Sequence, residues 1–75
     1  MQFDRELDAR GLNCPLPILR TKKGLAGMGQ GQVMRVMVTD PGAMKDFQAF
    51  SKQTGNELLQ VTEEEKVFVF YIRKR

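Results

Sequence analysis

The sequence predicts an α+β fold, a two-layer sandwich in which a four-stranded mixed sheet carries two helices on one face. The expected element order is β-α-β-α-β-β. Segments with a two-residue hydrophobic period alternate twice with segments of helical period, and a hairpin follows them. Crossover helices on short loops place strands side by side and cover one face of the sheet. The 75 residues suffice for one domain, residues 1–75, with a stability of a few kcal/mol.

The first half of the chain supplies a strand, a helix and a second strand. Residues 2–8 alternate apolar and acidic side chains, which is typical of a strand with one wet face. A helical period begins at Pro15, and the glycine-rich stretch 27–31 ends it. The apolar stripe of this helix is expected to comprise Pro15, Ile18, Leu19, Leu25 and Ala26. Residues 32–39 (QVMRVMVT) form the next strand. Its inner face is expected to carry Met34, Val36 and Val38.

The second half supplies a helix and a hairpin. Asp40-Pro41 is expected to begin the helix, because Asp caps free amides and Pro requires no acceptor. Gly55 ends this helix. Its buried stripe is expected to comprise Ala43, Phe47, Phe50 and Thr54. Leu58–Thr62 and Val67–Arg73 then form two strands around the turn 63–66.

Two features depart from the expected pattern. Lys22 falls in the middle of the first helix's predicted apolar stripe, and the last strand is apolar on both faces. A long side-chain stem lying over the edge of the core accounts for the lysine, and a central place in the sheet accounts for the strand. The alternative is that both mark a surface that docks a partner.

The composition excludes several classes of protein. The chain has one cysteine and no histidine, which excludes an intramolecular disulfide, Cys-His pairs and the common zinc sites, so neither a metal nor a cofactor is expected. The longest apolar run, residues 67–72, is far shorter than the roughly 20 residues that span a bilayer. The N-terminus lacks the apolar core of a signal peptide. A cytoplasmic location is therefore expected.

The single cysteine stands in Asn13-Cys14-Pro15-Leu16-Pro17. Both prolines suit the first turn of a helix, which places Cys14 at or near its N-cap, beside a polar Asn13. Free amides and the positive end of the helix dipole are expected there to lower the pKa of the thiol and stabilise a thiolate. Leu16 is expected to shield one side of the sulfur. The prolines thus present the sulfur rather than bury it.

A lone thiolate without a base can accept a group and release it to a partner. Redox cycling needs a second cysteine, and acyl transfer needs a base. A persulfide suits such a carrier, because another thiolate can attack its terminal sulfur directly. Two other interpretations stay open: a thiol-redox regulator, and a nucleic-acid-binding module that uses the net charge of +3.

The run Leu7–Pro17 (LDARGLNCPLP) closely resembles the signature of the TusA/SirA-like sulfur-carrier family, whose hallmark is Cys-Pro-x-Pro at the start of the first helix. The likeness continues through Asp40-Pro41, through residues 55–58 and into the basic C-terminal strand. The resemblance implies a carrier, rather than a self-sufficient enzyme, whose Cys14 is loaded as a persulfide by a cysteine desulfurase or a rhodanese. It implies delivery to an acceptor such as a DsrE-like protein, for tRNA thiolation, molybdenum cofactor synthesis or dissimilatory sulfur oxidation. Pro15 and Pro17 carry over as motif positions.

A basic cluster on the first helix is a candidate docking patch for such partners. It comprises Arg20, Lys22 and Lys23. Lys22 lies eight residues beyond Cys14, about 12 Å along the helix axis, so direct contact with the sulfur is not expected. We further expect a monomer or weak dimer that binds no membrane and no nucleic acid directly.

Overall fold

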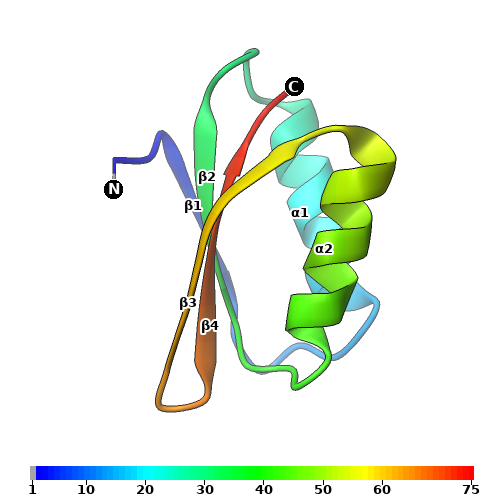
Figure 1. Ribbon diagram of the computed structural model, residues 1–75, viewed down its shortest axis with the longest axis vertical. Coiled ribbons are helices and arrows are strands. Elements are labelled where there is room, and N and C mark those ends of the chain that lie inside the picture. Colours follow the sequence, from blue (N-terminus) through cyan, green and yellow to red (C-terminus); the bar gives the residue numbers. More distant parts are fainter. Residues whose placement is uncertain (1) are drawn as a thin grey trace.

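The computed structural model describes residues 2–75, and its six elements follow one another in the predicted order (Figure 1). They are β1 (Arg5–Ala9), α1 (Leu16–Ala26), β2 (Val33–Val38), α2 (Ala43–Thr54), β3 (Glu57–Glu64) and β4 (Val67–Arg73). The strands form one mixed sheet in the order β1-β2-β4-β3, in which β1 and β2 are parallel and the other neighbours antiparallel. Both helices cover the same face of the sheet. The predicted fold class is therefore confirmed.

The core lies between the helices and the inner face of the two central strands. β2 buries Met34, Val36 and Val38, as its two-residue period predicts. Opposite them, the rings of Phe47 from α2 and Phe70 from β4 stack with their centroids 4.3 Å apart. Stacked rings add to the burial free energy, so this pair anchors α2 on the sheet.

The position of β4 explains why it is apolar on both faces. β4 lies between β2 and β3, where neither of its edges meets solvent. On the outer face, Tyr71 is half-buried, and its hydroxyl accepts a hydrogen bond from Arg35 Nε at 3.2 Å. Phe3 lies against both side chains, its ring centroid 6.3 Å from that of Tyr71 and 5.8 Å from the Arg35 guanidinium carbon. The first strand begins at Arg5, later than predicted, and Phe3 before it contributes to this outer cover.

The buried stripe of α1 differs from the prediction. The helix buries Pro17, Thr21 and Leu25, whereas Leu19 is 53% exposed. The prediction followed apolar residue types, but the buried Thr21 satisfies its hydroxyl by donating to the Pro17 carbonyl at 2.8 Å. Pro15, Ala26 and Lys22 are exposed as well, so Lys22 does not interrupt a buried stripe.

The helix α2 begins later than predicted. Its first residue is Ala43 and its N-cap is Gly42, so Asp40-Pro41 precedes the helix rather than opening it. Asp40 instead accepts a hydrogen bond from the Gly42 amide on its carboxylate, at 3.2 Å, and one from the Ala43 amide on its carbonyl, at 3.0 Å. The C-terminus agrees with the prediction, since Gly55 adopts the left-handed conformation with φ of 80°.

The hairpin turn is tighter than predicted. β3 extends to Glu64, and only Glu65 and Lys66 lie between the two strands, with φ of 50° and 67°. Two consecutive left-handed residues are the geometry of the tight turns that match the twist of a hairpin. The sequence predicted a longer turn, because neither Gly nor Asn occupies the two left-handed positions, Glu65 and Lys66.

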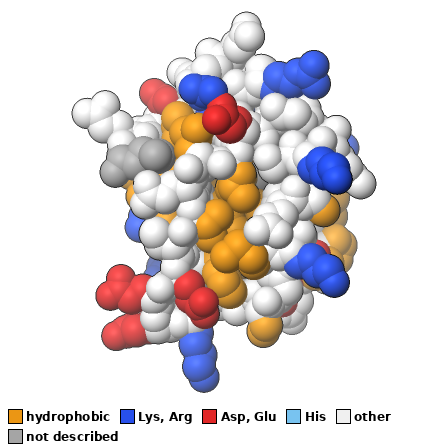
Figure 2. Space-filling model, viewed as in Figure 1, with side chains coloured by type: hydrophobic (Ala, Val, Ile, Leu, Met, Phe, Trp, Pro, Cys, Tyr) orange, Lys and Arg blue, Asp and Glu red, His pale blue; other side chains and the backbone are white. Residues whose placement is uncertain are grey.

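β3 is an edge strand and leaves part of the core visible. Figure 2 shows hydrophobic side chains in a band between this edge of the sheet and α2. Half-buried apolar residues that pack against the core in this part of the molecule include Met44 of α2, Leu58 and Val61 of β3, and Phe68 of the neighbouring β4. Within residues 2–75, no helix is both long and apolar enough to cross a membrane.

Candidate functional site

Cys14 is exposed in the loop that joins β1 to α1. This loop lies at the end of the sheet where the parallel strands β1 and β2 both finish, beside the loop from β2 to α2 (Figure 1). Two loops that follow parallel strands meet at one edge of a sheet, which is where α/β folds commonly place their sites. The topology therefore brings residues near position 14 next to residues near position 40.

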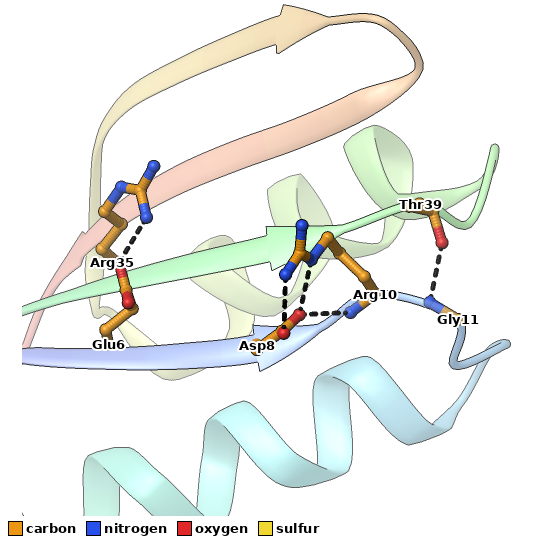
Figure 3. A network of polar contacts seen from close by, with 6 residues as sticks. All are labelled: Glu6, Asp8, Arg10, Gly11, Arg35 and Thr39. Atoms are coloured by element: carbon orange, nitrogen blue, oxygen red, sulfur yellow. Dashed lines mark hydrogen bonds and ion pairs between the residues drawn. The ribbon is translucent and has the colours of Figure 1, made fainter.

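Backbone hydrogen bonds hold the segment that leads to Cys14. The Gly11 amide donates to Thr39 Oγ1 at the end of β2, at 2.9 Å (Figure 3). Gly11 has φ of 81°, a conformation that Gly adopts without strain. At the end of β1, Arg10 donates to both carboxylate oxygens of Asp8, and these hydrogen bonds lower the pKa of Asp8 to about 2. The loop therefore leaves the sheet in a fixed direction.

The Cys14 backbone is tied directly to the start of α2. Its amide donates to Asp40 Oδ2 at 2.9 Å, while Asp40 Oδ1 accepts from the Gly42 amide at 3.2 Å. One carboxylate thus bridges two loops that are 26 residues apart in sequence. Sequence reasoning missed this role of Asp40, which it interpreted as a helix cap. The signal that could have found it is topological, because both loops follow parallel strands.

The two prolines shape the start of α1. Pro15 is the N-cap residue and Pro17 is buried, while Leu16 and Asn13 are exposed beside Cys14. The Leu16 amide donates to the Asn13 carbonyl at 2.9 Å. Because prolines have no amide hydrogen and Leu16 has already used its own, the first turn has few donors left for an anion. Cys14 itself lies one residue before the N-cap.

The surroundings of Cys14 are acidic, and the predicted stabilised thiolate is therefore wrong. The pKa of the Cys14 thiol is raised above its ordinary value, first by a hydrogen bond to the Asp46 carboxylate. Partial desolvation and the negative charges of Asp46 and Asp40 act in the same direction. Asp46 belongs to the first turn of α2. These two carboxylates act against the effect expected of the α1 dipole, and no residue of the Cys-Pro-x-Pro motif indicates their presence.

The site provides an exposed thiol that can carry a group, with the carboxylates of Asp40 and Asp46 beside it. The chain has no second cysteine and no histidine. Among residues 2–75, no three acidic or sulfur side chains are grouped closely enough to hold a metal ion. An exposed sulfur on a rigid loop suits attack on a donor and later attack by an acceptor, both supplied by other proteins.

The structure separates the three predicted docking residues. Arg20 and Lys23 line a groove of about 780 Å³ between α1 and β1, together with Arg5. Lys22 lines a different groove, of about 320 Å³, between the two helices. Lys74 and Arg75 of the C-terminus share that second groove. The patch predicted from the sequence is therefore two surfaces on opposite sides of α1.

Comparisons with known proteins agree with the fold and identify the family. The family model described as sulfurtransferase TusA matches residues 5–74. The sulfur carrier protein TusA of Allochromatium vinosum is 64% identical over 72 residues, covering 96% of this chain and 95% of its own. The putative sulfur carrier protein YrkI of Bacillus subtilis is 46% identical over 74 residues, with 99% of each chain covered. A crystal structure of a SirA-like protein from Desulfitobacterium hafniense superposes with a TM-score of 0.83 at 29% identity, covering 93% of this chain and 96% of that one.

Proposed function

This chain belongs to the TusA family of sulfurtransferases, and we propose on that basis that it is a sulfur carrier whose Cys14 holds the transferred sulfur as a persulfide. The observation that supports this most directly is the exposed, rigidly held Cys14 in a chain with no other cysteine. Residues 1–75 act as one carrier domain.

Loading and delivery are two attacks on a sulfane sulfur. In loading, the Cys14 thiolate attacks the terminal sulfur of a donor persulfide, the donor's S–S bond breaks, and the donor leaves as a thiolate. In delivery, an acceptor thiolate attacks the outer sulfur of Cys14–S–S⁻, and Cys14 leaves as a thiolate that takes up a proton. Neither step has a net oxidant or reductant, because one S–S bond forms as another breaks.

The neighbours of Cys14 position the sulfur and keep it protonated between encounters. Asp40 fixes the Cys14 backbone, and Pro15 and Pro17 hold the first turn of α1. The carboxylates of Asp40 and Asp46 raise the pKa of the resting thiol. A partner that places a cation against these carboxylates lowers that pKa, and so favours both loading and release.

Donor and acceptor are other proteins. A cysteine desulfurase or a rhodanese would supply the sulfur, and a DsrE-like protein or another sulfurtransferase would receive it. The onward route is thiolation of tRNA, sulfuration of a molybdenum cofactor or dissimilatory sulfur oxidation, in the cytoplasm. Arg20, Lys22 and Lys23 are exposed on the helix that follows Cys14, which supports a part for them in docking these proteins.

The raised pKa of Cys14 disfavours the redox-regulator interpretation. Peroxide oxidises the thiolate, and sensor cysteines have lowered pKa values. The carboxylates around Cys14 reduce the thiolate fraction at neutral pH. A low thiolate fraction is compatible with a sulfur carrier, because a carrier reacts only when a partner protein is docked.

Intact-mass spectrometry tests the proposal. The purified chain is incubated with thiosulfate and a rhodanese, or with cysteine and a desulfurase, and we expect a gain of one sulfur atom that a reductant reverses. Cys14→Ser should show no gain and keep its circular dichroism spectrum. A sulfur adduct on the Cys14→Ser variant, or no adduct on the parent chain with either donor, would overturn the proposal.

A further inference from the structure

A basic groove follows α1 away from Cys14. It occupies about 780 Å³ along the side of α1 that faces β1. The lining side chains are Arg5, Arg20 and Lys23, with Leu19 and Met34 between them. Leu19 is 53% exposed, so its side chain is available for an apolar contact. The groove thus combines three cations with an apolar floor.

The cations of the groove have no carboxylate partner within the chain. Among residues 2–75, the ion pairs within 4.0 Å join Arg10, Arg35 and Arg73 to acidic residues, and none involves a cation of the groove. Glu6 also lines the groove, but its charge is compensated by Arg35. The positive charge of the groove is therefore available to an external anion.

Arg5 is held in place across the groove. Its Nη1 donates to the Gly24 carbonyl at 3.0 Å, which ties the edge strand to the third turn of α1. Gly27 stands beside the same guanidinium, and a Cβ there would lie 3.4 Å from Arg5 Nη1. A guanidinium anchored at one nitrogen still presents its remaining N–H groups to a carboxylate.

The sheet edge beside the groove is open. β1 is the first strand in the order β1-β2-β4-β3, so within residues 2–75 no strand pairs with its outer edge. An open edge offers N–H and C=O groups on alternate residues, which an extended segment of another chain can pair with. The open edge therefore favours an extended peptide as the occupant over a small inorganic anion such as phosphate.

We propose that the groove between β1 and α1 binds an extended acidic segment of the protein that exchanges sulfur with Cys14. Its acidic side chains pair with Arg5, Arg20 and Lys23, an apolar side chain contacts Leu19, and its backbone lies along β1. This inference rests on the proposed function, because the segment belongs to a partner that reaches Cys14 at the same time.

The dimensions fit this assignment. The helical part of the groove runs from Leu19 to Gly27, a rise of about 12 Å, which an extended chain covers with about four residues. Leu19 lies about one turn beyond the start of α1 at Leu16. A segment bound here holds the rest of its protein beside the Cys14 loop.

An NMR titration tests the groove without any sulfur chemistry. The probe is a blocked eight-residue peptide in which pairs of glutamates alternate with pairs of valines, so that each face of the extended peptide carries both kinds of side chain. It is added at low salt to the isotope-labelled chain. We expect amide shifts concentrated in β1 and in residues 19–27 of α1. The double variant Arg20→Glu with Lys23→Glu should bind about tenfold more weakly, because two attractive contacts become repulsive. The matched control Lys52→Glu with Lys66→Glu makes the same charge change on exposed residues outside the groove and should bind as the parent does.

Three outcomes would overturn the inference. They are equal weakening in the two double variants, shifts confined to the groove of Lys22, Lys74 and Arg75, and equal binding of an oligothymidylate of the same charge. The last would indicate a general anion surface that favours nucleic acid. A chain that binds the peptide but never gains sulfur contradicts the proposed function alone. A chain that gains sulfur but ignores the peptide contradicts this inference alone.

Discussion

Replacing Asp40 with Ala should destabilise the fold and make Cys14 more reactive. The carboxylate accepts hydrogen bonds from the amides of Cys14 and Gly42, at 2.9 and 3.2 Å. Asp40 is only half-buried, so each bond is assigned about 1 kcal/mol, near the middle of the range for neutral bonds and below that for bonds to ions. The loss is then about 2 kcal/mol, which lowers the Tm of a chain of this length by roughly 10 °C.

Asp4→Ala is the matched control. Asp4 Oδ2 accepts one hydrogen bond from a backbone amide, that of Val33, at 2.8 Å, away from the Cys14 loop. Its loss should lower the Tm by about half as much. The assays are thermal unfolding by circular dichroism, and alkylation of Cys14 by iodoacetamide at 25 °C.

The two variants should differ in reactivity. Removing the charge of Asp40 lowers the raised pKa of the Cys14 thiol, so alkylation at neutral pH accelerates in Asp40→Ala and not in Asp4→Ala. A Tm for Asp40→Ala no lower than that of Asp4→Ala would refute the idea that one carboxylate fastens both loops. Equal alkylation rates would refute its electrostatic effect on the sulfur.

Three further changes test other parts of the structure. Asp46→Asn should shift the pH profile of Cys14 alkylation to lower pH, because the first cause of the raised thiol pKa is removed; an unmoved profile contradicts the role of Asp46. Phe47→Ala should lower the free energy of unfolding, measured with urea, by about 3–5 kcal/mol, because this side chain is 1% exposed and stacks on Phe70. A loss below about 1.5 kcal/mol would show that the core closes around the gap. Lys66→Gly should raise the Tm, because φ of 67° costs a lysine about 1 kcal/mol more than a glycine, and a lower Tm would argue against the left-handed turn.

The sequence predicted the sheet better than it predicted the helix boundaries. The two-residue period of β2 and the two apolar faces of β4 reflect burial directly, so both strands could be inferred, and a central place is one of the two interpretations that the sequence allows for β4. The face of α1 could not be inferred from residue type, because Thr21 is buried through a hydrogen bond to its own helix while Leu19 remains exposed. Residue type alone therefore does not determine which face of α1 is buried.

The sequence predicted only the part of the candidate site that consecutive residues form. The Cys-Pro-x-Pro motif identified the position of the sulfur, and its prolines indicated the start of a helix. The electrostatics came from Asp40 and Asp46, which only the parallel pairing of β1 with β2 brings close. A helix-dipole argument considers one element, whereas the pKa of an exposed thiol depends on every charge around it.

The carboxylates beside Cys14 also affect how readily small thiols remove the carried sulfur when no partner protein is bound. The abundant small thiols of cells carry net negative charge, so Asp40 and Asp46 repel the very reagents that would strip sulfur from a persulfide. A thiol with a raised pKa is moreover a slow leaving group, which delays release to any attacker that has not changed the local charge. The same two side chains that make the empty carrier unreactive would therefore keep the loaded one from leaking its sulfur into solution.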